Sequence, residues 1–158
     1  MTRFLFTALF AMSVIAASAQ VAPHGWRGPA RDGIYPETAL LKQWPTAGPA
    51  LKWEVMDAGK GYSSPVVVGD RVYITGMSDD QSMEIFTAYT LDGKKLYSVP
   101  YSKPWDGQYP ETRTTPTIDN GKAYLISGAG QVVCLSTADG KILWSVDGAK
   151  QYSRKTGN

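Results

Sequence analysis

The sequence predicts an all-β protein whose main part is one four-stranded antiparallel sheet built twice. Ten Pro and sixteen Gly are spread along 158 residues, and nine Tyr with five Trp are many for this length. This mixture is typical of short strands joined by tight turns. A segment of the chain also recurs once, and both copies show the alternation of apolar and polar residues that half-buried strands have. These observations together favour a repeated, all-β fold.

Residues 1–19 have the features of a Sec-type signal peptide. Arg3 supplies a positive charge, residues 4–16 an apolar stretch, and residues 17–19 (ASA) a cleavage site before Gln20. A transmembrane anchor is the alternative, but the apolar run is shorter than the roughly 20 residues that a spanning helix needs. We therefore expect an exported protein, periplasmic or extracellular, with no membrane span after cleavage.

Residues 20–50 are expected to be an extended segment, and residues 51–55 to be a single strand. The sequence LKWEV of this strand resembles the last strand of each later copy, with Trp53 in the place of Tyr97 and Trp144. In a repeat fold, such a strand can complete a sheet elsewhere in the molecule. The three aromatic residues are expected to dock one sheet on the next, and replacing a buried Trp by Ala costs about 3–5 kcal/mol.

The two copies cover residues 61–100 and 112–147. Pro65 and Tyr73 have counterparts 51 residues later, whereas the turn Asp92-Gly93 has its counterpart 47 residues later. The difference predicts a longer loop near residues 78–82 in the first copy. Strands are expected at about 63–68, 71–76, 83–90 and 94–99, and at about 114–119, 122–127, 130–136 and 141–146.

Four antiparallel strands in a repeat of about 45–50 residues form the unit of a β-propeller blade. Closed propellers have roughly 4–8 blades, so two blades, one strand and a tail at residues 148–158 predict an incomplete propeller. An N-terminal fragment whose remaining blades are missing is the favoured interpretation. Assembly of several copies into one ring is the alternative.

Residues 134–144 (CLSTADGKILW) resemble the repeat of the pyrroloquinoline-quinone-like (PQQ-like) β-propeller family, with Ser136 where the family usually has Asp. Residues 25–33 (GWRGPARDG) and 61–65 (GYSSP) resemble the start of secreted members. The resemblance implies the fold more specifically than the activity. The family includes quinoprotein dehydrogenases, which hold PQQ and a calcium ion on the propeller axis, and non-catalytic scaffolds such as the propeller subunit of the outer-membrane barrel-assembly machinery.

No catalytic residue and no metal site is predicted within this chain. Cys134 is the only cysteine, so the vicinal Cys pair that the resemblance implies for the dehydrogenases is absent, and a buried structural thiol is expected instead. His24 is the only histidine, which excludes a multi-histidine zinc site. PQQ and calcium are therefore expected only if a full-length protein supplies the missing residues.

Three residues are candidates for ligand binding. Tyr62 and Arg113 precede the first strand of their copies at equivalent positions, and the innermost strand of a blade faces the central channel. The Arg113 guanidinium suits an anionic ligand, and a surface ion pair with Glu111 is its alternative. Trp105, in the Pro- and Gly-containing loop 103–110, is expected to be an exposed aromatic that contacts a partner.

The charge pattern argues against nucleic-acid binding, because the net charge is +2 and no basic run occurs. Three functions stay open. The favoured one is an exported, non-catalytic propeller module that binds a protein or small-molecule ligand through its loops. The others are the N-terminal part of a PQQ-dependent alcohol dehydrogenase-like enzyme and a carbohydrate-binding protein that uses Trp26, Trp44 and Trp105.

Overall fold

The computed structural model describes residues 24–28, 30–35 and 37–152, so the signal peptide predicted at residues 1–19 lies outside the described residues. The first sheet has the strand order β1 (Val66–Val68), β2 (Arg71–Met77), β3 (Glu84–Thr90) and β4 (Lys95–Ser102). The second has the order β5 (Thr117–Asp119), β6 (Lys122–Ile126), β7 (Gln131–Ser136) and β8 (Ile142–Asp147), followed by a helical turn, α1 (Gly148–Gln151). All neighbouring strands are antiparallel. The all-β class and the two four-stranded blades are confirmed.

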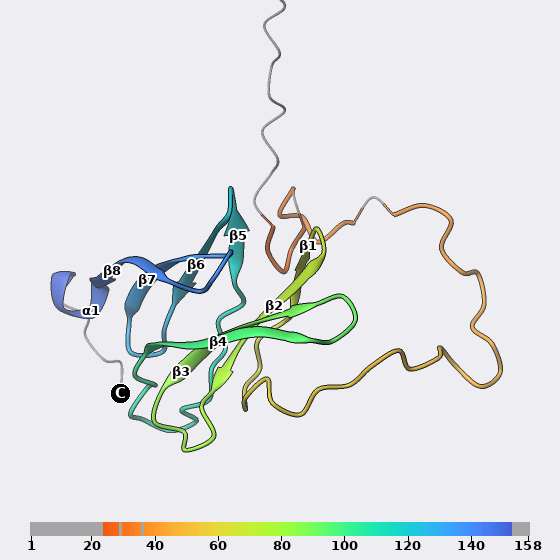
Figure 1. The fold of residues 1–158 in the computed structure, drawn as a ribbon. Helices are drawn as coiled ribbons and strands as arrows, with labels where there is room; N and C mark the ends of the chain where they lie inside the picture. The colour runs from red at the N-terminus through yellow and green to blue at the C-terminus, as the bar shows by residue number, and fades with distance from the viewer. Residues whose placement is uncertain (1–23, 29, 36, 153–158) are drawn as a thin grey trace, which may run out of the picture.

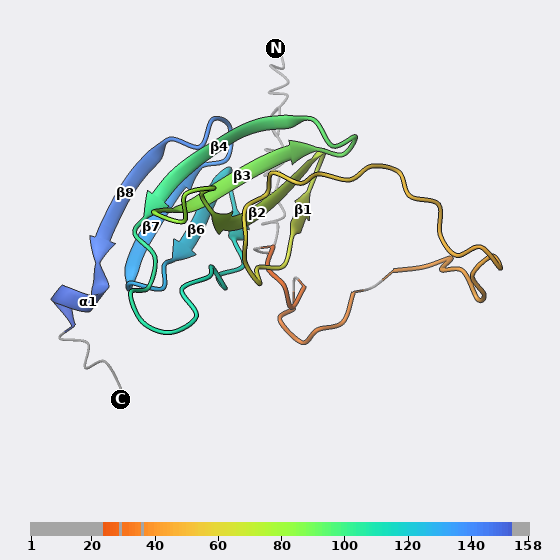
Figure 2. The same ribbon diagram turned by 90° about the horizontal axis from the view of Figure 1, so that it is seen from below.

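The two sheets lie next to each other as layers and share one apolar core (Figures 1 and 2). The first sheet contributes the aromatic residues Tyr73, Phe86 and Tyr101, and the second contributes Leu125 and Leu135 among others. Tyr73 and Phe86 stack with ring centroids 5.8 Å apart. Because each sheet buries one face against the other, the core lies between the repeats, as it does between neighbouring propeller blades.

The segments that lead into β1 and β5 run side by side. Gly61 and Thr112 form a parallel bridge, and the Tyr62 N–H donates to the Thr112 carbonyl at 2.7 Å. These residues occupy equivalent positions in the two copies. Two blades related by rotation about the propeller axis run in the same direction at equivalent positions, so their pairing is parallel. β1 and β5 start at Val66 and Thr117, later than the expected residues 63 and 114.

Residues 51–55 are not a strand, contrary to the sequence-based expectation. The following residues lie against a face of the first sheet, where Asp57 accepts a hydrogen bond from the Tyr89 hydroxyl at 2.9 Å, and the Ala58 carbonyl closely approaches Gly76. A segment that runs across the face of a sheet does not lie beside an edge strand. It therefore cannot form the row of backbone hydrogen bonds that makes a strand. The Trp53 indole nevertheless donates to the Leu91 carbonyl at 2.7 Å.

Trp53 and Tyr97 contact equivalent turns in the two sheets. A Cβ added to Gly93 would lie 2.9 Å from the Trp53 ring, and one added to Gly140 would lie 2.8 Å from the Tyr97 ring. The Tyr97 hydroxyl donates to the Thr137 carbonyl at 2.9 Å. An aromatic ring from the preceding part of the chain thus covers the glycine of each β3–β4 or β7–β8 turn.

Trp144 occupies the matching position in β8 but covers no glycine turn in the part of the chain that the structure describes. It is 45% exposed and packs beside Tyr124, with ring centroids 6.2 Å apart. The cost of about 3–5 kcal/mol given for a buried Trp therefore does not apply to Trp144 in this chain.

The longer loop expected near residues 78–82 joins β2 to β3. The Asp80 carboxylate accepts hydrogen bonds from the Ser78 hydroxyl at 2.6 Å and the Ser82 N–H at 3.0 Å. These hydrogen bonds lower the pKa of Asp80 to about 2. Its oxygens thus close the loop on itself.

Candidate functional site

The connection between the two sheets, residues 103–116, is held by hydrogen bonds on both sides. The Ser64 N–H donates to Thr115 Oγ1 at 3.1 Å, the Thr112 hydroxyl donates to Met77 Sδ at 3.4 Å, and the Thr114 hydroxyl donates to the Ile126 carbonyl. Because the partners lie in the lead to β1, in β2 and in β6, the second half of this loop is fixed relative to both sheets.

A pocket of about 400 Å³ opens beside this loop. Its lining combines aromatic, apolar, acidic and basic residues, namely Glu84, Trp105, Tyr109, Glu111, Arg113, Thr114, Ile126, Ser127 and Gly128. Two of the three predicted binding residues, Trp105 and Arg113, are thus brought together. Tyr62 is 70% exposed and does not line the pocket.

Arg113 is exposed, and its Nη2 donates to the Tyr109 carbonyl at 3.3 Å. Glu111, the alternative ion-pair partner of Arg113, instead pairs with Lys60, with its Oε1 2.8 Å from Lys60 Nζ, and Arg113 is close enough for its charge to act on the Glu111 carboxylate. The hydrogen bond from Lys60 lowers the pKa of Glu111. Within the described residues no carboxylate forms an ion pair with Arg113, so its guanidinium can accept an anionic group of a ligand.

Trp105 is half-buried, whereas the sequence predicted an exposed residue. A Cβ added to Gly128 would lie 2.9 Å from Trp105 Cβ, so the tryptophan backbone packs on the β6–β7 turn. Neither Trp26 nor Trp44 lines the pocket with it. The platform of three tryptophans expected for a carbohydrate-binding protein is therefore not formed.

Glu84 is a pocket residue that the sequence did not single out. It is 1% exposed, its Oε1 accepts a hydrogen bond from the Gly128 N–H at 2.9 Å, and its Oε2 accepts one from the Tyr101 hydroxyl. Burial raises the pKa of Glu84 above the ordinary value of 4.5. The carboxyl group links β3 of one sheet to a turn of the other, so it holds the two walls of the pocket together.

Comparison with known families identifies a family whose model matches most of the chain. The sequence model of a family of PQQ-like repeats, described as outer membrane protein assembly factor BamB, matches residues 36–151. The chain belongs to this PQQ-like β-propeller family. The match covers both sheets and the loop between them, and confirms the resemblance first found at residues 134–144. No curated protein matches the chain significantly.

The described residues of this PQQ-like chain do not fit a calcium ion. Calcium takes about six to eight oxygen ligands, and among residues 24–28, 30–35 and 37–152 no three His, Cys, Asp or Glu side chains could hold a metal together. Cys134 is buried, and burial raises the pKa of its thiol. PQQ and calcium stay predictions. In the same part of the chain, no helix is both long and apolar enough for a membrane span.

The buried Glu84 predicts a pH dependence of stability. Because its folded-state pKa is raised, its contribution to stability is fully present below the unfolded-state pKa and is lost as pH rises through the folded-state pKa. We expect the free energy of unfolding to fall with rising pH in this window, and to fall less in Glu84→Gln. Chemical denaturation between about pH 4 and pH 8 measures this. Glu54→Gln, at an exposed site, is the control, and equal pH profiles for Glu84→Gln and the unmodified chain would contradict the prediction.

Proposed function

We propose that the chain acts as an exported, non-catalytic binding module that holds a polypeptide partner at the pocket beside residues 103–116. The observation that carries this proposal is the meeting of Trp105, Tyr109 and Arg113, which forms no ion pair with the described residues, at the loop between two blades. Trp, Tyr and Arg are the residue types that contribute most to protein–protein binding energy. The family description, an outer membrane protein assembly factor, supports a polypeptide partner and a place in the cell envelope.

The pocket presents both apolar surface and a charged group to a partner. Tyr109 is 69% exposed and Ile126 is 58% exposed, so both present apolar surface to a partner. Arg113 can pair with a partner carboxylate through its planar fork. Lys60 and Glu111 form an ion pair at the edge, and Arg113 adds a further positive charge to the pocket. An extended peptide segment with an acidic and an aromatic or aliphatic residue would fit this set.

Site-specific cross-linking tests the proposal. The photoreactive residue is introduced as Tyr109→p-benzoylphenylalanine in cells that produce the full chain, and as Tyr152→p-benzoylphenylalanine, also exposed, in the control. We expect a discrete polypeptide partner to cross-link at position 109 only. Arg113→Gln should then weaken the affinity of the purified partner by about tenfold or more, whereas Lys122→Gln should not. Cross-linking at both positions, or equal affinities of the two variants, would overturn the proposal.

A further inference from the structure

The segment around Trp26 is fixed on the free edge of β5. His24 and Ile118 exchange two backbone hydrogen bonds of 2.8 Å, so the segment extends the second sheet by one residue pair. The Gly33 N–H donates to the Arg27 carbonyl at 2.9 Å, and the Tyr35 hydroxyl donates to the Trp26 carbonyl at 2.7 Å. These bonds close the segment into a turn and fix the backbone from which its side chains project.

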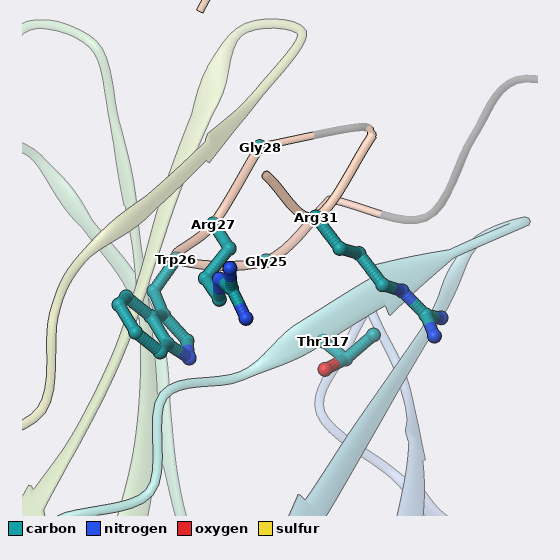
Figure 3. Close-up of a pocket in the computed structure, with 6 residues that line it drawn as sticks. All are labelled: Gly25, Trp26, Arg27, Gly28, Arg31 and Thr117. Atoms are coloured by element: carbon teal, nitrogen blue, oxygen red, sulfur yellow. The ribbon is translucent and has the colours of Figure 1, made fainter. Parts of the chain in front are cut away.

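A pocket of about 330 Å³ lies between this turn and β5. It is lined by Gly25, Trp26, Arg27, Gly28, Arg31 and Thr117. In Figure 3 the Arg27 side chain points between Trp26 and Thr117, and the Arg31 side chain reaches past the other side of Thr117. The Arg27 guanidinium carbon lies 5.7 Å from the centroid of the Trp26 ring, a cation–π contact that orients this guanidinium.

Arg27 and Arg31 bring two positive charges to this pocket, and Asp32, next to Arg31 in the sequence, carries the nearby negative charge. No described carboxylate forms an ion pair with Arg27 or Arg31, and the nearby Asp32 accepts a hydrogen bond from the Ile34 N–H at 2.9 Å. The Thr117 hydroxyl also forms no hydrogen bond with the described residues. Two guanidinium forks and a hydroxyl therefore line one pocket as hydrogen-bond donors that lack an acceptor among the described residues.

We propose that this pocket binds a small molecule through an oxyanion, a carboxylate or a phosphate, held by Arg27 and Arg31. Guanidinium forks match the paired oxygens of both groups. The Thr117 hydroxyl supplies a further donor, and the Trp26 ring supplies an apolar wall. A volume of about 330 Å³ lies in the range of small-molecule sites. The pocket shares no residue with the one beside residues 103–116, so the two proposals stand independently.

Titration of the full chain with inorganic phosphate and, separately, with succinate tests the site at constant ionic strength. The readout is the NMR shift of the Trp26 indole N–H. We expect the shifts to saturate with anion concentration. Arg27→Gln and Arg31→Gln should each lower the affinity for the anion about tenfold. Lys42→Gln removes the same charge from an exposed position outside the pocket and should leave the affinity unchanged. Saturation with phosphate alone assigns a phosphate ligand, and saturation with succinate alone assigns a carboxylate.

Three results would overturn the proposal: no saturation with either anion, the same shifts with chloride, or equal weakening by Lys42→Gln. The amide shifts of His24 and Ile118 report whether a variant keeps the turn on β5. Arg31→Lys provides a second test, because it keeps the charge but removes the fork. It should bind more weakly than the unmodified chain and more tightly than Arg31→Gln.

Discussion

Replacing Phe86 by Ala is expected to lower the free energy of unfolding by about 3–5 kcal/mol. Phe86 is 0% exposed and lies in the core between the two sheets. Its ring stacks on Tyr73 and lies 6.0 Å from the ring of Tyr97. Truncation removes these contacts and leaves a cavity at the blade interface. Urea denaturation measures the effect as a lower midpoint at an unchanged slope.

Tyr62→Ala is the matched control for this prediction, since Tyr62 is an aromatic residue of the same blade that is 70% exposed. Its cost should stay within about 0.5 kcal/mol. A cost below about 1 kcal/mol for Phe86→Ala would mean that the two sheets do not share a packed core.

Replacing Gly140 by Ala is expected to cost about 2–4 kcal/mol, the sum of two effects. Gly140 has φ +74°, a conformation that strains an L-residue, and its new Cβ would lie 2.8 Å from the Tyr97 ring. The ring would have to move, and its hydrogen bond to the Thr137 carbonyl would be lost. Gly69→Ala isolates the first effect, because Gly69 has φ +61° with no atom within 4 Å of the added Cβ. Its cost should be about 1–2 kcal/mol.

A double-mutant cycle separates the docking contact from backbone strain. In a Tyr97→Ala background the ring is gone and only the Val99 methyl, 3.0 Å from the added Cβ, stays close, so the cost of Gly140→Ala should fall toward that of Gly69→Ala. The free energies of unfolding should therefore be non-additive by about 1–2 kcal/mol. Strict additivity would show that Tyr97 does not cover the Gly140 turn.

The repeat and its turns could be predicted from the sequence because they depend on local information. Asp92-Gly93 and Asp139-Gly140, each between two strand-like segments, indicate hairpin turns, and the spacing of the copies located the longer loop that Asp80 closes. The extra strand at residues 51–55 was wrong for a different reason. Its residue pattern matches an outer strand, but whether a segment pairs with an edge or crosses a face depends on what lies beside it.

Trp105 and Arg113 were separate candidates in the sequence, which did not predict that they line one pocket, and Tyr62, the third candidate, does not line it. Glu84 was missed because its partners, Tyr101 and Gly128, become neighbours only when the sheets pack. The Lys60–Glu111 ion pair could have been predicted from the repeat. The two residues occupy equivalent positions, 51 apart, in leads that run side by side.

The central claim is that the two copies are consecutive blades, and that an aromatic ring of one blade docks on the turn of the next. A two-dimensional NOE spectrum of the full chain tests this claim most directly. The structure predicts cross-peaks from the Tyr97 ring protons to the Gly140 Hα protons, and from the Trp53 indole protons to those of Gly93. Both glycines should show ring-current shifts. Cross-peaks of Tyr97 confined to its own sheet, with ordinary Gly140 shifts, would contradict the account.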